Sequence, residues 1–200
     1  MKSATQTNLN ERRSLQTQKR LVDATIQSLV EQGFSRTTGV EICRRAELTR
    51  GAMNHHYPDL ADLYIAALQS VYQTLGTGDE ALEECGPLES LLLNSYQRIV
   101  QPEFKVVIEL WLASRNDPEF GSQLAKAIAA GSSMFSPKTV LSSADLSRQP
   151  ELAVTYRMIQ ETLIGLGLGR VVDNGSAVGH EKQVVQMLLQ LARSADKKIK

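Results

Sequence analysis

The stretch TRGAMNHHYPDL, residues 49–60, has the features of a short helix that approaches another surface closely. Thr49 is a residue type favoured at helix N-caps. Pro58 is expected to end the helix, because the residue before a proline avoids the αR conformation. Gly51 and Ala52 are small and leave the backbone of this helix accessible. The stretch therefore predicts a short, well-delimited helix with one open face.

The adjacent histidines in this stretch, His55 and His56, raise the alternative of a metal site. Neighbouring helical residues point in different directions and rarely bind one ion together. Helical metal sites favour histidines four positions apart, and the third histidine, His180, is remote in sequence. We therefore expect no metal and no cofactor. We expect His56 to pack near the end of the helix.

The residues just before this stretch predict a second short helix, from Gly39 to Arg45. Thr38 can cap its N-terminus, and Ile42 and Ala46 are its expected inward contacts. The segment AELT then forms a tight turn before Thr49. Two short helices joined by such a turn, spanning about 38–57, have the dimensions of a helix-turn-helix.

In a helix-turn-helix, the second helix reads base edges in the major groove through its N-terminal residues. Thr49 and Arg50 offer a hydroxyl, a guanidinium and backbone N–H groups, which suit phosphate oxygens. Asn54 and His55 add donors and acceptors further along the helix. The full set of predicted DNA contacts is Thr37, Thr38, Arg44, Arg45, Thr49, Arg50, Gly51, Ala52, Asn54 and His55.

The remainder of the chain predicts an all-α fold of about nine helices. A first helix is expected over about 11–32, after a loose segment 1–10, with an inward face of Val22, Thr25, Ile26 and Leu29. Gly33 is expected to end it in the αL conformation, with Phe34 folding back on Leu29. Prolines mark later helix starts at Pro87, Pro102, Pro118 and Pro150, residues 136–149 are expected to form a loop, and a last helix covers about 180–193. The expected division is a DNA-binding head over 1–58 and a helical body over 59–200.

Composition is ordinary for a folded, cytoplasmic protein. No stretch reaches the roughly 18 consecutive apolar residues of a membrane span, and the N-terminus lacks a secretory apolar core. The two cysteines, Cys43 and Cys85, do not indicate a disulfide framework. Residues 1–58 hold nine Lys and Arg against five Asp and Glu, a net charge of +4, and the remainder carries −4. This asymmetry modestly favours an anion-binding head.

At this point the sequence resembles the TetR family of transcriptional regulators. The resemblance covers about 20–68, RLVDATIQSLVEQGFSRTTGVEICRRAELTRGAMNHHYPDLADLYIAAL, and includes the Gly33-Phe34 stop and the HHYP that closes the recognition helix. It implies a homodimer on a pseudo-palindromic DNA operator, repression, and release by a small-molecule effector. Three positions depart from the family pattern. Glu47 stands where the family usually has a glycine in the turn. Asn54 stands where the family usually has an aromatic residue. Leu60 stands where the family commonly has a lysine that contacts a DNA phosphate.

The resemblance also implies an effector pocket in the body, for which the sequence offers a set of aromatic, polar and methionine residues. Core packing is the alternative for each of them. The candidates are Tyr96, Phe104, Trp111, Arg115, Met134, Phe135 and Met158. The dimer interface is expected on the helices at about 150–173 and 180–193, which are apolar on more than one face.

Two other functions remain open. The departures at Asn54 and Leu60 leave room for a ligand-sensing dimer with weak or lost specific DNA binding. An all-α enzyme is not expected, because no catalytic constellation is recognisable around Trp111, Arg115 or Cys85. The GLGLGR segment, 165–170, lacks the GxGxxG spacing of a nucleotide-binding loop, so its small residues are expected to permit close helix packing.

Overall fold

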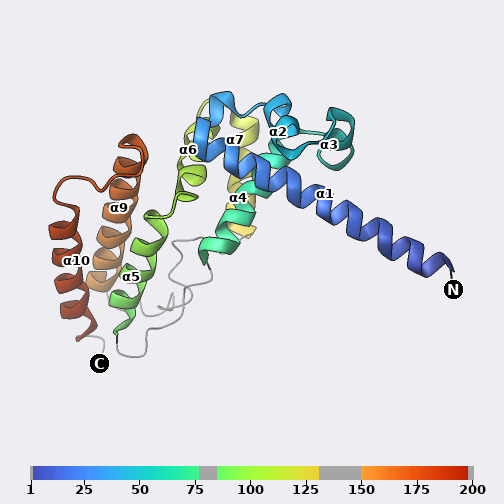
Figure 1. Cartoon of the computed structure of the whole chain (residues 1–200). Coiled ribbons are helices and arrows are strands. Elements are labelled where there is room, and N and C mark those ends of the chain that lie inside the picture. Colours follow the sequence, from blue (N-terminus) through green and yellow to red (C-terminus); the bar gives the residue numbers. More distant parts are fainter. Residues whose placement is uncertain (1, 77–84, 131–149, 198–200) are drawn as a thin grey trace. The chain divides into compact units, whose positions relative to one another are not determined.

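The predicted all-α class is confirmed by the computed structural model, which describes residues 2–76, 85–130 and 150–197 (Figure 1). These ranges hold nine α-helices and one 3-10 turn. The elements are α1 (Lys2–Gln32), η1 (Phe34–Arg36), α2 (Gly39–Ala46), α3 (Arg50–His56), α4 (Leu60–Gly76), α5 (Pro87–Ile99), α6 (Phe104–Ser114), α7 (Pro118–Ala130), α9 (Pro150–Val172) and α10 (Glu181–Asp196). The loop predicted over 136–149 lies outside the described residues. No described helix is long and apolar enough to cross a bilayer.

The chain forms two compact units whose limits differ from the expected boundary near residue 58. The first unit comprises 1–71 and 105–130, and the second comprises 72–104 and 131–200. The predicted head therefore shares its unit with most of α4 and with α6 and α7.

Helix α1 is longer than predicted, because it begins at Lys2 and not near Glu11. The expectation of a loose segment over residues 2–10 was wrong. No glycine or proline occurs between Lys2 and Gln32, so nothing in that stretch interrupts a helix once it has formed. The helix is thus a rod of 31 residues.

The buried face of α1 is shifted by one position from the predicted one. Its fully or nearly buried residues are Leu21, Ala24, Thr25, Ser28 and Leu29, while Val22 and Ile26 are half-exposed. Thr25 donates its hydroxyl hydrogen to the carbonyl oxygen of Leu21 at 2.8 Å. Ser28 is paired with Thr37 at 2.9 Å. Hydroxyls satisfied in this way can be buried, so hydrophobicity alone misplaced the face.

The end of α1 is held by side chains from α6. Gly33 has the predicted positive φ of 77°, but its ψ of 176° lies outside the αL region. The N–H of Phe34 donates to Oε2 of Glu109 at 2.7 Å, and Nζ of Lys105 donates to the carbonyl oxygen of Val30 at 3.2 Å. A Cβ on Gly33 would lie 3.3 Å from the Glu109 carboxylate, so a glycine suits both the backbone angle and this close contact.

Phe34 joins an aromatic cluster with residues of α4 and α7. Its ring centroid lies 5.1 Å from that of Tyr64 in α4 and 6.3 Å from that of Phe120 in α7. Tyr64 and Phe120 are themselves 6.1 Å apart. The cluster packs α4 and α7 of the first unit against the segment that follows α1.

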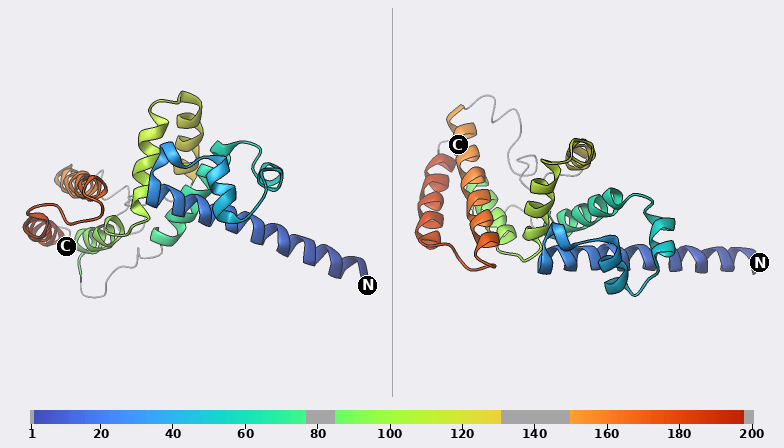
Figure 2. Two further views of the ribbon diagram at one scale, coloured as in Figure 1. Left: turned by 45° about the horizontal axis from the view of Figure 1, so that its top comes forward. Right: turned by 90° about the horizontal axis from the view of Figure 1, so that it is seen from above.

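In the second unit, α5, α9 and α10 lie side by side (Figure 2). Their shared core is built from leucine, isoleucine and valine, namely Leu88, Leu91, Leu92, Ile159, Leu163, Val185 and Leu188. The buried carboxylate of Glu181 accepts from Tyr96 at 2.7 Å, from Arg170 at 2.7 Å and from the N–H of Val178 at 3.0 Å.

The last helix, α10, extends three residues beyond its predicted end at Arg193. Asp196 belongs to α10 and caps α5 by accepting from the N–H groups of Leu88 and Glu89 at 2.9 and 3.1 Å.

The glycines of the GLGLGR segment lie within α9, and two of them permit the close packing predicted for them. A Cβ on Gly167 would collide with the ring of Phe104, and one on Gly169 would lie 2.6 Å from Val178. Gly165 has open space at its Cβ position and is exposed.

Candidate nucleic-acid interface

Helices α2 and α3 are both capped by threonine, as predicted. Oγ1 of Thr38 accepts from the N–H of Glu41 at 3.3 Å. Oγ1 of Thr49 accepts from the N–H of Ala52 at 3.1 Å. Each hydroxyl satisfies one of the backbone donors that a helix N-terminus leaves unpaired. The two short helices therefore have defined starting points.

A small core fixes α3 against α2. Ile42, Cys43, Ala46 and Met53 are all buried, which confirms the predicted inward positions of Ile42 and Ala46. Sγ of Cys43 lies 3.6 Å from Sδ of Met53, and burial raises the pKa of the Cys43 thiol. A Cβ on Gly39 would lie 3.2 Å from Cε of Met53, a close contact that the methionine side chain would have to relieve.

The turn between the helices places Glu47 in the left-handed conformation, with φ 51° and ψ 47°. That conformation costs a non-glycine residue about 1–2 kcal/mol. The N–H of Leu48 donates to the carbonyl oxygen of Cys43 at 3.0 Å, and the guanidinium of Arg20 donates to the carbonyl oxygen of Ala46. Arg20 thus ties α1 to the turn. This role was missed in the sequence, because the partner of Arg20 is a backbone atom 26 positions away.

The outer face of α3 carries polar and small side chains that the protein's own core does not use. Arg50 has no ion pair with any described residue, and a Cβ on Gly51 would meet nothing closer than Oγ1 of Thr49 at 3.8 Å. Ala52 is half-exposed. The exposed members of this α3 face are Thr49, Arg50, Gly51, Asn54 and His55.

Thr37 does not belong to that exposed surface. Its exposed fraction is 1%, and its hydroxyl donates to the carbonyl oxygen of Gly33 at 2.8 Å while pairing with Ser28. The hydroxyl of Tyr64 donates to the carbonyl oxygen of Thr37. The geometry removes the Thr37 side chain from the predicted DNA contacts, because this hydroxyl is already engaged inside the protein. Thr38, in contrast, is exposed.

Arg44 and Arg45 are both paired with carboxylates. Arg44 bonds Glu41 through two nitrogens at 2.8 Å and stays 67% exposed. Arg45 bonds Glu31 at 2.6 Å and Glu41 at 2.7 Å, and its side chain is 11% exposed. Hydrogen bonds from Arg44, Arg45 and Gln32 hold the pKa of Glu41 far below its usual range. Arg45 is therefore placed as a structural residue, whereas Arg44 can still reach outward.

The candidate effector residues are spread over both units. In the second unit, Tyr96 is bonded to Glu181 and Phe104 is 1% exposed, so their contacts favour the alternative of core packing. Met158 is 51% exposed and lines an open depression along α9 with Ala153, Val154, Arg157, Glu161 and Thr162.

In the first unit, Arg115 is exposed, and Trp111 is half-buried with an indole Nε1 that is buried without a hydrogen-bond partner. Met134 and Phe135 lie outside the described residues.

The rings of the paired histidines, His55 and His56, have centroids 5.2 Å apart. The part of the chain that the structure describes holds no cluster of three metal-ligating side chains.

A model of the bacterial regulatory proteins of the tetR family matches residues 21–67, the segment that contains both capped helices and the turn. The chain therefore carries a segment similar to the N-terminal part of the tetR family. Among its relatives are two regulators of Pseudomonas putida. CymR is 22% identical over 121 residues, covering 58% of this chain and 60% of CymR. TtgR is 31% identical over 91 residues, covering 42% of this chain and 43% of TtgR. The chain thus spans less than two thirds of either relative's length.

Solved structures show a likeness in fold over most of the chain. A transcriptional regulator from Rhodococcus sp. Rha1 superposes with a TM-score of 0.67 at 19% identity, covering 90% of this chain and 96% of that one. The multidrug binding protein EbrR, complexed with ethidium, superposes with a TM-score of 0.61 at 18% identity, covering 88% and 98%. At such identities the likeness concerns the fold alone.

Proposed function

We propose that this chain is a homodimeric transcriptional repressor of the TetR family that binds a pseudo-palindromic DNA operator and is released by a small-molecule effector. The observation that carries the DNA-binding part is the outer face of α3. Its five exposed residues run from the N-cap Thr49 to His55 in the last turn of the helix, and Arg50 has no ion pair with a described residue. Such a face suits the major groove and its flanking phosphates.

The exposed apolar residues of α9 support a dimer. Val154, Met158, Leu168 and Val172 are 59%, 51%, 41% and 78% exposed. With exposed Glu161 and Gly165 they recur at alternating intervals of four and three, the spacing of a helix–helix seam. Met187 adds an exposed apolar residue on α10 at 70%. A second copy of the chain covering this stripe would form a four-helix interface of two-fold symmetry.

Release by an effector follows the family and requires a ligand that prefers the protein conformation unable to bind the operator. The unpaired Nε1 of Trp111 supports Trp111 as one contact, because a buried donor without a partner is satisfied when a ligand supplies an acceptor. The depression on α9 that includes Met158 belongs to the dimer stripe described above, so it supports the interface more than an effector pocket.

Selection of DNA from a random library with the purified full-length chain tests the proposal. The expected result is an enriched inverted repeat whose half-sites are separated by about one helical turn. Two variants on the same DNA then locate the contact. Arg50→Ala is expected to weaken binding at least tenfold. Gly51→Ala is expected to leave folding intact, because its Cβ would meet only Oγ1 of Thr49 at an ordinary contact distance of 3.8 Å. It is still expected to weaken binding if α3 approaches the groove closely.

Each alternative function has its own outcome in this experiment. A folded dimer that enriches no sequence would favour the ligand-sensing protein with lost specific DNA binding, and would point to Glu47, Asn54 and Leu60 as the cause. An enriched sequence that both variants bind as tightly as the wild type would remove the α3 face from the DNA contact.

A further inference from the structure

The positive charge of the head is confined to its first 20 residues. Residues 1–20 contain five Lys and Arg and a single acidic residue, Glu11, whereas residues 21–58 contain four of each sign. The net charge of +4 over 1–58 therefore lies entirely on the N-terminal part of α1. Residues 21–58, which include the helix-turn-helix, carry no net charge and so add no net attraction for a polyanion.

Some of the arginines within residues 21–58 also form ion pairs with carboxylates of the protein itself. Arg45 is shared between Glu31 and Glu41, and Arg44 is held by the same Glu41 at 2.8 Å. Arg50 and Arg36 remain without ion pairs among the described residues, and both are exposed. The α2–α3 surface thus offers few free charges for phosphates.

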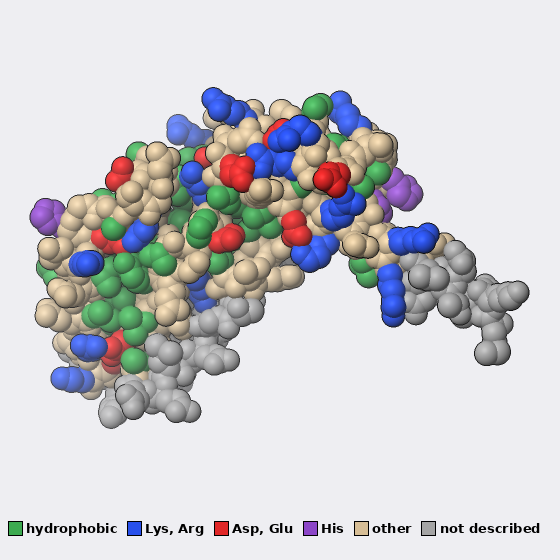
Figure 3. All heavy atoms as spheres, viewed as in Figure 1, with side chains coloured by type: hydrophobic (Ala, Val, Ile, Leu, Met, Phe, Trp, Pro, Cys, Tyr) green, Lys and Arg blue, Asp and Glu red, His purple; other side chains and the backbone are tan. Residues whose placement is uncertain are grey.

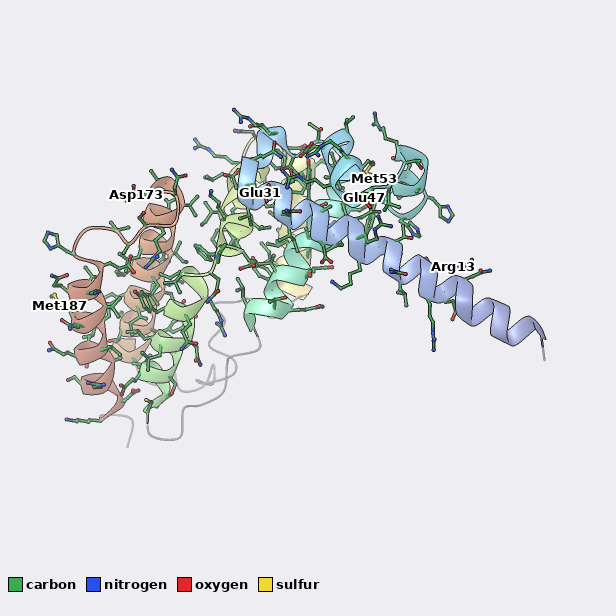
Figure 4. All side chains as sticks on the ribbon, in the orientation of Figure 1. Arg13, Glu31, Glu47, Met53, Asp173 and Met187 are labelled. Carbon is green, nitrogen blue, oxygen red and sulfur yellow. The ribbon has the colours of Figure 1, made fainter. Side chains whose placement is uncertain are left out.

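The N-terminal part of α1 extends past the α2–α3 turn. Arg20 marks the crossing point, because its guanidinium donates to the carbonyl oxygen of Ala46 at the end of α2. From Arg20 the helix continues to Lys2, and Arg13 lies about 10 Å beyond the crossing at a rise of 1.5 Å per residue. Figure 4 labels Arg13 on the part of α1 that projects beyond α2 and α3. We refer to residues 2–20 as the α1 overhang.

Most side chains of the α1 overhang from residue 10 to residue 20 are exposed. Arg12 and Arg13 are exposed, and neither forms an ion pair with a described residue. Lys19 pairs with Asp23 at 2.7 Å, with side-chain exposed fractions of 74% and 55%. Figure 3 shows Lys and Arg side chains at this end of the molecule and over α1–α3. A cationic rod next to the recognition helix complements the phosphate backbone that flanks a groove-bound helix.

We propose that the α1 overhang is a second DNA-contact surface, which binds backbone phosphates flanking the bases read by α3 through Arg12 and Arg13. The inference rests on the DNA binding proposed above. It adds that most of the electrostatic attraction between the protein and DNA comes from the overhang. Contacts of this kind carry no base information, so they strengthen binding to every sequence alike. In this proposal α3 selects the DNA sequence, and the overhang supplies affinity that does not depend on sequence.

The test compares the wild type with the double variant Arg12→Gln and Arg13→Gln, both full-length. Fluorescence anisotropy measures binding to the operator recovered by selection and to a scrambled duplex, from 50 to 300 mM salt. Each phosphate contact that is removed lowers the slope of log K against log salt by about 0.9, so a dimer missing four is expected to lose about 3.6. Lys126→Gln with Lys182→Gln, two exposed lysines outside the overhang, removes the same formal charge and is expected to keep the wild-type slope.

Three results would overturn the inference while leaving the proposed function intact. An unchanged slope and affinity on the operator would show that the overhang does not touch DNA. A loss on the operator but not on the scrambled duplex would indicate base reading and not phosphate binding. A change in sedimentation without a change in slope would show that the overhang binds a second copy of the chain. If the wild type binds neither duplex, the proposed function itself fails, and this inference with it.

Discussion

Glu109 and Phe34 are 75 positions apart in sequence, yet Oε2 of Glu109 accepts the backbone N–H of Phe34 at 2.7 Å. Four residues earlier on the same helix, Lys105 donates to the carbonyl oxygen of Val30 at 3.2 Å. Two side chains of α6 therefore form hydrogen bonds with the backbone at the end of α1, one with an N–H group and one with a carbonyl oxygen. These two contacts help to hold the end of α1, from which the chain continues into the helix-turn-helix.

Glu109→Ala is expected to lower the free energy of unfolding by about 2 kcal/mol, because a charge-assisted hydrogen bond is removed and the Phe34 N–H is left partly buried. Urea unfolding followed by circular dichroism measures the change. Asp23→Asn is the control, since it breaks the exposed pair with Lys19 and should cost no more than about 0.5 kcal/mol. Equal effects of the two substitutions would show that the hydrogen bond between Glu109 and Phe34 contributes no more to stability than an exposed ion pair.

Glu47→Gly is expected to raise the free energy of unfolding by about 1 kcal/mol, because glycine adopts the left-handed conformation without the steric penalty of a Cβ. The substitution also removes the ion pair between Arg20 and the Glu47 carboxylate, but this pair is long, at 3.5 Å, and exposed, so its removal offsets little. Glu47→Ala removes the same charge but keeps the strain. A gain in both variants, measured by thermal and urea unfolding, would assign the effect to charge instead of conformation.

Glu181 is expected to make the second unit sensitive to acid. Burial alone would raise the pKa of Glu181, but hydrogen bonds from Arg170, Tyr96 and the N–H of Val178 outweigh it and lower the pKa below 4.5. A carboxyl group with a depressed folded-state pKa contributes stability at pH values above its unfolded pKa, and that contribution is lost as the pH falls through the folded value. Wild-type stability should therefore decline below about pH 4.5 by more than that of Glu181→Gln, in urea unfolding repeated from pH 3 to 7. Parallel curves for the two proteins would contradict this.

Leu168→Lys combined with Val172→Lys is expected to yield folded monomers, because both side chains are exposed on the protomer and charges placed there oppose only the proposed dimer seam. Sedimentation velocity measures the oligomeric state, and circular dichroism checks the fold. Leu112→Lys, at a position 57% exposed on α6, is the matched control and should stay dimeric. Dissociation of the control, or persistence of the dimer in the double variant, would exclude α9 as the interface.

Local features of the helix-turn-helix could be predicted from the sequence because each depends on residues within a few positions. Thr38 and Thr49 cap helices whose first turns follow them directly, and Ile42 and Ala46 share one helical face. The unusual Glu47 was also visible as a departure at a turn position. Its positive φ shows why a glycine is favoured there.

Contacts distant in sequence could not be predicted in the same way. Thr37 is indistinguishable in sequence from an exposed hydroxyl until Ser28 and Tyr64 are brought beside it. Glu109 and Arg20 bond backbone atoms of other elements, which leave no pattern in the residues themselves. For the α1 overhang a signal was present, because a count over shorter windows would have placed all of the excess positive charge before residue 21.

The cap that Asp196 provides for α5 sets a limit on how far the chain can be shortened. The carboxylate of Asp196 accepts the N–H groups of Leu88 and Glu89 from more than 100 positions away, and Arg193, one turn earlier, bonds Glu89 at 2.8 Å. Deletions that stop at Lys197 preserve both contacts. Deletions that continue through Arg193 expose the start of α5 and invite proteolysis there, so residue 197 is the safe endpoint for trimming.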